Sequence, residues 1–137
     1  MSDLEAETQV VRDFYAALNR NDIPAITAAF APQIEWTDPA DAGGGTWQGF
    51  AAVTKHFAEA RGNWAEGTRE PERFITAGDN VVVFAHVHVR VEGETEWREG
   101  DLVDVFTFRN GMIEQGRSFS DRQEALEWAG AEAADIS

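Results

Sequence analysis

The sequence predicts an α+β domain in which helices cover one side of a strongly curved antiparallel sheet and enclose a pocket. The chain has 137 residues, which suits one domain. Apolar residues recur at helical spacing in the first half, and from about residue 69 they alternate with polar residues as in strands. Helices on one side of an antiparallel sheet form an α+β fold, and long twisted strands curl into a half-barrel. We expect a single domain over 1–137, with its core at about 4–130 and a frayed tail at 131–137.

Three helices are expected before the main sheet. The first spans 4–20, and its apolar stripe consists of Val11, Phe14, Tyr15 and Leu18. A second, short helix follows Asp22, which can cap it, and stops before Pro32. The third runs from about Phe50 to Arg61, and Gly62 is expected just beyond its end. The apolar face of this third helix consists of Phe50, Val53, Phe57 and Ala60.

The strands follow from a period of two and from turn residues. A short strand is predicted at Ile34–Thr37, between the second and third helices. Four longer strands are predicted near 69–77, 80–91, 96–109 and 112–119. Asn110-Gly111 is the strongest of the hairpin signals between them. Asp121, with Glu124 three residues later, is typical of a capping box for a last helix that ends near Gly130.

Composition excludes several classes of partner. The net charge is −14, so a nucleic acid or an anionic membrane would repel the chain. No cysteine is present, which excludes disulfides, thiolate nucleophiles and cysteine-bound metals. The first nine residues are acidic and polar, unlike a targeting peptide, and no apolar run suits a membrane helix. We expect a cytoplasmic protein that binds neither nucleic acid nor membrane.

Four segments carry a resemblance to a known superfamily: VVRDFYAALNRNDI at 10–23, IEWTDP at 34–39, GTWQGFAAVTKHF at 45–57 and DVFTFRNGMIEQGRSFSD at 104–121. Through them nearly the whole chain resembles the nuclear transport factor 2-like (cystatin-like) superfamily, in particular its ketosteroid isomerase and SnoaL-like polyketide cyclase branches. The resemblance implies a cone-shaped half-barrel, three N-terminal helices around a pocket, and a homodimer. Because the superfamily holds isomerases, cyclases, hydrolases, dehydratases and non-catalytic binding domains, the function has to be argued from the site.

Asp38 is the leading candidate for a reactive group. It follows Trp36 at a strand end and precedes Pro39, so it is either a turn residue or a general base. Aromatic neighbours would desolvate its carboxylate, which suits proton transfer at a carbon next to a carbonyl group. The resemblance implies the same role, because the ketosteroid isomerases place their proton shuttle in this Asp-Pro context.

Asp104 stands out because it lies inside an apolar strand, where Asp is rare. One interpretation places it on the outer face, paired with an arginine or at a subunit interface. The other places it in the pocket, where a buried, protonated Asp would donate a hydrogen bond to an oxyanion, as in the ketosteroid isomerases. Its position six residues before Asn110 resembles that of the oxyanion-hole Asp of those isomerases, or of a catalytic His of the cyclases.

Two positions depart from the family patterns. The isomerases carry an oxyanion-hole Tyr on the first helix where this chain has Phe14. Tyr15 is rotated by ~100° around the helix and cannot simply replace it. Ser118 stands where the cyclases have an acid/base Asp, and a hydroxyl is no acid near neutral pH. A non-catalytic binding domain is therefore an alternative to an enzyme.

Aromatic residues are expected to shape the pocket for a small apolar, flat or polycyclic ligand. The residues expected to bind it are Phe14, Trp36, Trp47, Phe57, Trp64, Phe106 and Ser118. Trp97 and Trp128 are instead expected in core or interface packing. The glycines at 43–45 lack the features of a phosphate loop and suit a flexible lid.

The histidines are expected outside the site. His86 and His88 share one strand face, and the opposite face from Val81 to Val89 is wholly apolar, so it suits the core. The pair is expected on the outer sheet face, at a dimer interface together with Phe84. A His-x-His pair can bind metal, but no third ligand is evident, and we expect no metal and no cofactor. His56 is expected to face solvent or the helix edge, with lining of the pocket as the alternative.

The favoured hypothesis is a cofactor-independent enzyme, isomerase-like or cyclase-like, that acts on a small apolar carbonyl compound with Asp38 as base and Asp104 as hydrogen-bond donor. The alternatives are a non-catalytic ligand-binding domain with the same pocket and a structural dimerisation module.

Overall fold

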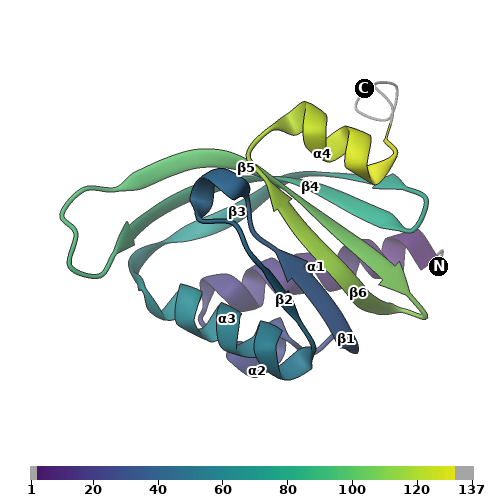
Figure 1. Ribbon diagram of the computed structural model, residues 1–137, viewed down its shortest axis with the longest axis horizontal. Coiled ribbons are helices and arrows are strands. Elements are labelled where there is room, and N and C mark those ends of the chain that lie inside the picture. The colour runs from purple at the N-terminus through teal and green to yellow at the C-terminus, as the bar shows by residue number, and fades with distance from the viewer. Residues whose placement is uncertain (1–2, 132–137) are drawn as a thin grey trace.

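A curved sheet of six strands forms the centre of the molecule, in the order β2-β1-β6-β5-β4-β3 (Figure 1). The structure is a computed structural model that describes residues 3–131. Its helices are α1 (Asp3–Asn19), α2 (Ile23–Ile26), α3 (Phe50–Gly62) and α4 (Arg122–Ala129), and a 3-10 turn spans Ala40–Ala42. Its strands are β1 (Phe30–Thr37), β2 (Thr46–Gln48), β3 (Trp64–Ala77), β4 (Asn80–Val91), β5 (Arg98–Arg109) and β6 (Met112–Phe119). The predicted α+β class is confirmed, while most of the tail expected to fray lies outside the described residues.

The first two strands differ from the sequence prediction. β1 pairs with β6 in parallel, so the sheet is not antiparallel throughout. Thr46–Gln48, for which no strand is predicted, pairs antiparallel with β1 and places Trp47 opposite Trp36. Hairpin signals fix the direction only of strands joined by tight turns, and β1 is separated from the later strands by α3. β3 also begins earlier than expected, at Trp64, because bulges near Glu66 and between Pro71 and Arg73 interrupt its period of two.

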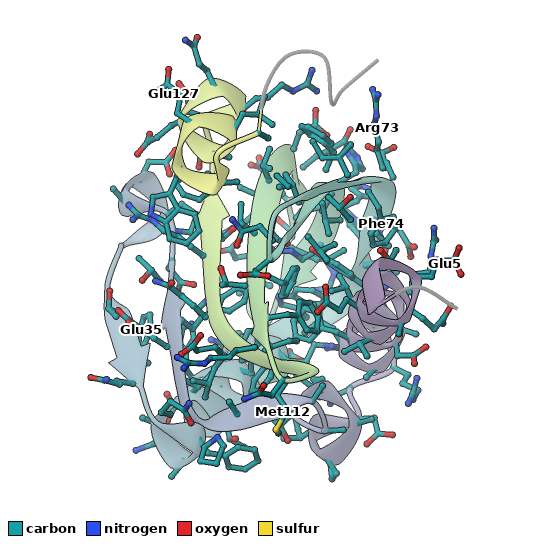
Figure 2. All side chains as sticks on the ribbon, turned by 90° about the vertical axis from the view of Figure 1, so that its right-hand side faces the viewer. Glu5, Glu35, Arg73, Phe74, Met112 and Glu127 are labelled. Atoms are coloured by element: carbon teal, nitrogen blue, oxygen red, sulfur yellow. The ribbon has the colours of Figure 1, made fainter. Side chains whose placement is uncertain are left out.

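The two faces of the sheet bury two separate cores. Figure 1 shows α1, α2 and α3 on one side of the sheet and α4 on the other. On the first side the alternating residues of β4, β5 and β6 meet the helices: Val81, Val83, Ala85, Phe106, Phe108 and Ile113. Figure 2 shows Phe74 of β3 beside α1, where the Arg12 guanidinium lies 4.2 Å from its ring centroid. The predicted core face of β4 is therefore confirmed from Val81 to Ala85, whereas Val87 is only half-buried.

The opposite face is partly covered by α4. Phe84 is buried there with Val82, Val105 and Ala125, and the guanidinium of Arg122 lies 4.8 Å from its ring. Phe84 is therefore covered by the chain's own last helix, which corrects its expected place at an interface. Within residues 3–131, no helix combines the length and the apolar character that crossing a membrane requires.

Most helix boundaries follow the predicted caps. Asp22 accepts a hydrogen bond from the Ala25 amide at 3.3 Å, and Asp121 accepts one from the Glu124 amide at 3.0 Å. α3 differs, because Gly62 is its last residue and Asn63 caps it. Phe50 is 42% exposed and does not join the core, whereas Val53, three residues later, is fully buried.

Gly116 of β6 makes room for a tryptophan. It is the parallel partner of Trp36 on β1, and a Cβ atom at residue 116 would lie 2.3 Å from Cε3 and Cζ3 of the indole. Trp36 is buried, and its ring centroid is 4.8 Å from that of Phe57. The indole therefore cannot move aside without disturbing the core.

Gly116→Ala is expected to lower the free energy of unfolding by about 1–3 kcal/mol, the usual cost of overpacking. Gly100→Ala on β5 is the matched control, because a Cβ atom there would meet nothing within 4 Å. The control is expected to stay within about 0.5 kcal/mol of the parent protein. Urea unfolding measures both, and equal stability of the two variants would contradict the packing argument.

Candidate active site

A cavity of about 180 Å³ lies between α1, α3 and the helix-covered face of the sheet. Three aromatic side chains from three different elements form its apolar walls: Trp36, Phe57 and Trp64. Five polar or charged side chains also line it: Asp38, His56, Arg61, Arg69 and Ser118. The expected pocket residues Asp38, Trp36, Phe57, Trp64 and Ser118 are thus brought together in one cavity.

Asp38 contacts two side chains at the end of β1. Its Oδ1 accepts a hydrogen bond from the indole Nε1 of Trp36 at 2.8 Å. Its Oδ2 lies 3.0 Å from Nε2 of His56. The Asp38 backbone N–H also donates to the Gly45 carbonyl at 3.1 Å, which fixes the turn after β1. The carboxylate is therefore fixed in direction at the wall of the cavity.

His56 corrects an expectation, because it faces the cavity and not the solvent. Its side chain is 15% exposed, and its ring stacks on Trp47 with centroids 3.6 Å apart and planes 12° apart. Trp47 does not line the cavity, but its stacking contact supports the imidazole ring of His56. The signal was present in the sequence, since His56 lies three residues after the buried Val53 and thus on the same side of α3.

Asp104 lies behind the cavity and accepts hydrogen bonds there. It is fully buried, and Tyr15 Oη donates to its Oδ2 at 2.5 Å. Arg69 donates through Nε to Oδ2 at 3.1 Å and through Nη2 to Oδ1. Asp104 does not line the cavity, so the expected role of a protonated donor to a ligand does not fit this geometry. Tyr15 does not line it either, but it reaches the same carboxylate.

Arg69 connects this buried group to the cavity. It lines the cavity from β3, and its Nη2 also donates to Ser118 Oγ at 3.1 Å. Arg69 was not predicted as a site residue. The predicted strand began at this residue, so no alternation on both sides of it indicated which face of the sheet its side chain would point to. Arg69, Asp104, Tyr15 and Ser118 form one connected network, in which Arg69 and Ser118 line the cavity and the other two lie behind it.

The network fixes the protonation of two of its members. Burial is the main cause that raises the pKa of Tyr15 well above its ordinary value of 10.0, and the negative charge of Asp104 raises it further. Burial alone would lower the pKa of Arg69, but Asp104 and other acidic groups nearby, including Asp38, outweigh it and raise the pKa. Tyr15 therefore remains a neutral donor and Arg69 a cation.

Phe14 and Phe106, expected to bind a ligand, pack in the core beside the cavity and do not line it. Their ring centroids are 5.3 Å apart, and Phe14 also meets Phe57 at 5.6 Å. They support the aromatic wall by holding Phe57 and Trp36 in place.

A second cavity of about 390 Å³ lies on the other side of Asp38. Asp38, Pro39 and Ser118 line both cavities. Gly44 and Gly45 line the second one, and Gly43, Gly44 and Gly45 all have positive φ, which favours glycine. The glycine segment therefore borders the approach to Asp38, and its motion as a lid stays a prediction.

His86 lies on the outer face of the sheet, as expected. Its Nδ1 is 2.8 Å from Asp101 Oδ1, and Glu72 lies close enough that donor atoms of the three residues are within 4.8 Å of one another. The two carboxylates are candidate metal ligands that the sequence did not place there. His88 packs against Trp97, which is 44% exposed and so lies outside the core.

The alkaline titration of Tyr15 tests the network, because the chain has a single tyrosine. Since the folded state raises its pKa, stability is complete below about pH 10 and falls as the pH rises above that value. Tyrosinate absorbance is expected to appear only together with unfolding, measured by circular dichroism on the same samples. Tyr15→Phe supplies the baseline, and tyrosinate in a protein with native dichroism near pH 10 would contradict the buried network.

Comparisons with known proteins agree with this architecture. The SnoaL-like domain pattern matches residues 11–115. An NTF2-like protein of unknown function from Burkholderia pseudomallei is 30% identical, with 96% of this chain and 100% of that chain covered and a TM-score of 0.75. TerC, whose crystal structure was determined with polyporic acid, is 25% identical, with 92% and 99% covered and a TM-score of 0.75.

An LEH-like epoxide hydrolase from M. tuberculosis shares the fold at 15% identity, with 90% of this chain and 88% of that chain covered and a TM-score of 0.72. No protein of curated function matches the sequence. The family pattern spans most of the chain, and the chain therefore belongs to the SnoaL-like domain family, with an NTF2-like fold.

Proposed function

We propose that this protein is a cofactor-independent enzyme that moves a proton on a carbon next to the carbonyl group of a small, mainly apolar compound. The observation that carries the proposal is the close pair of Asp38 and His56, with Oδ2 and Nε2 3.0 Å apart, at the wall of a cavity that three aromatic side chains also line. A fixed carboxylate that is partly shielded from water is a suitable general base. Asp38 would take the proton from the carbon, the C–H electrons would form an enolate, and Asp38 would return the proton to that carbon or to a conjugated one.

His56 is proposed as a positioning residue for this base. Its Nε2 holds the carboxylate from one side while the Trp36 indole holds it from the other. Stacking on Trp47 fixes the imidazole plane, so that Asp38 keeps one direction toward the cavity. Such pre-orientation lowers the entropy that has to be lost in reaching the transition state.

Arg69 and Ser118 are proposed to stabilise the enolate oxygen. Ser118 Oγ accepts a hydrogen bond from Arg69, so its own hydroxyl proton can be donated into the cavity. Arg69 adds a permanent positive charge at the same wall. Oriented donors of this kind act mainly on the charge that develops in the transition state.

Asp104 and Tyr15 are proposed to act through Arg69. Both acceptor oxygens of Asp104 are used by Arg69 and Tyr15, which fixes the guanidinium at the cavity wall. Asp104 is thereby assigned a positioning role in place of direct contact with substrate.

A non-catalytic binding domain is the second candidate. Phe14 lies in the core and supplies no donor, and Ser118 is no acid, which favours binding without chemistry. The co-crystallisation of TerC with polyporic acid supports a small organic ligand for either candidate. The two adjoining cavities, of about 180 and 390 Å³, argue against a purely structural module.

Asp38→Asn is expected to slow catalysed hydrogen–deuterium exchange by about 10²–10⁴-fold, the usual contribution of a general base. The exchange is measured by NMR in heavy water at the carbons next to the carbonyl of 1-indanone, 1-tetralone and 2-tetralone. Asp41→Asn is the matched control, since Asp41 lies in the neighbouring turn and borders only the second cavity. Full exchange activity in Asp38→Asn would contradict the role of Asp38 as the base. If the parent protein catalyses no exchange with any of the three ketones, the enzymatic function is contradicted and the non-catalytic binding domain becomes the favoured candidate.

A homodimer through the outer sheet face belongs to the same proposal. The exposed Trp97 packs against His88 on this face and supplies its apolar contact area. Trp97→Glu is expected to shift the protein from dimer to monomer in light scattering, because it places a negative charge in the contact. An unchanged mass would show that the dimer, if one forms, uses another face.

A further inference from the structure

Two arginines line the cavity of about 180 Å³, here called the inner cavity, and only one of them has an acidic partner. Arg69 forms an ion pair with Asp104. Arg61, on the last turn of α3, has no carboxylate within ion-pair distance anywhere in the part of the chain that the structure describes. Acidic residues outnumber basic ones by 25 to 11, so an arginine without an acidic partner at a cavity wall calls for a physical explanation.

The Arg61 guanidinium is held in place but only partly used. Nε donates to the Leu18 carbonyl at 2.7 Å and Nη2 to the Asn19 carbonyl at 3.1 Å, at the C-terminal end of α1. Its Cζ lies 4.8 Å from the ring centroid of Trp64. Nη1 makes no hydrogen bond to any residue between 3 and 131. One edge of the guanidinium is thus fixed, and its remaining amino group is available to a ligand.

The surroundings favour an anion at this position. Burial lowers the pKa of Arg61, so the cation has lost part of its hydration without gaining a negative neighbour. A partly desolvated guanidinium without an acidic partner forms its strongest contacts as charge-assisted hydrogen bonds to a planar oxyanion. The adjacent walls of Trp36, Phe57 and Trp64 suit a flat apolar body.

We propose that the cavity takes a flat, largely apolar compound that carries one oxyanion, and that Arg61 binds this oxyanion. The inner cavity is smaller than the roughly 300 Å³ at which pockets for drug-sized ligands begin, so one or two fused rings are the size expected. The expectation that the reacting carbon of this compound lies at Asp38 rests on the proposed function. The preference for an anion at Arg61 concerns binding alone and does not depend on catalysis.

Calorimetric titration with paired probes tests the proposal. 2-Naphthoate is compared with methyl 2-naphthoate, and ionised 2-hydroxy-1,4-naphthoquinone with 2-methoxy-1,4-naphthoquinone, so that a carboxylate and an acidic enol are distinguished. At least one anion is expected to bind about tenfold or more tightly than its neutral partner, although the protein carries a net charge of −14. Equal binding of both members in each pair, or no binding of either anion, would overturn the ligand class.

Arg61→Gln is expected to weaken binding of the anion by about 10–100-fold and to leave the neutral probe within about twofold. Lys55→Gln removes the same charge from an exposed position of α3 and is expected to change neither probe. Because Arg61 also holds the end of α1, Arg61→Lys serves as a second variant that keeps the charge and should keep most of the preference for the anion. A merely structural role would weaken both probes equally in Arg61→Gln, and that result would contradict the proposal.

The same samples separate this proposal from the proposed function. Asp38→Asn is expected to bind both probes while it loses hydrogen exchange on the ketones. If the protein catalyses hydrogen exchange but binds anionic and neutral probes equally, only the proposed ligand class is contradicted. If it prefers the anion but catalyses no exchange, only the proposed enzymatic function is contradicted.

Discussion

The buried ion pair of Arg69 and Asp104 is the interaction on which the site depends. Two charges taken out of water carry a large desolvation cost, which only good geometry and full hydrogen bonding offset. Here Arg69 uses two nitrogens, and Tyr15 supplies a further donor to the same carboxylate. The contact joins α1, β3 and β5, and through Ser118 it reaches β6. Loss of one partner would leave an unpaired buried charge at the floor of the cavity.

Core packing and the site use the same side chains. Trp36 fills the space above Gly116, packs on Phe57 and donates its indole N–H to Asp38. A change in the core is therefore transmitted to the direction of the carboxylate. This coupling explains why the cavity wall is built from large aromatic rings, because rigid groups with few torsions hold a functional neighbour at low entropic cost. The aromatic rings Phe14 and Phe106 give this support from the core.

The sheet divides the molecule into two sides that carry different groups. The helix-covered side contains Asp38, His56 and Arg61, whereas the outer side carries α4 and the contact between His86 and Asp101. Because neighbouring residues of a strand point to opposite faces, one strand serves both sides: β4 contributes alternate residues to each core. A shift of one residue in register would exchange the two faces.

The sequence by itself determined the helices, the hairpins and the place of Asp38, because these depend on periodicity and turn residues that act over a few positions. For Asp104 it left two places open, the outer face and the pocket. Only the tertiary structure decided what these groups meet: His56 approaches Asp38 from α3, and Arg69 reaches Asp104 from 35 residues away. Tyr15, 89 residues from Asp104, completes that network. Such partners are chosen by how the sheet curves and by which strand lies beside which, and no local pattern records either.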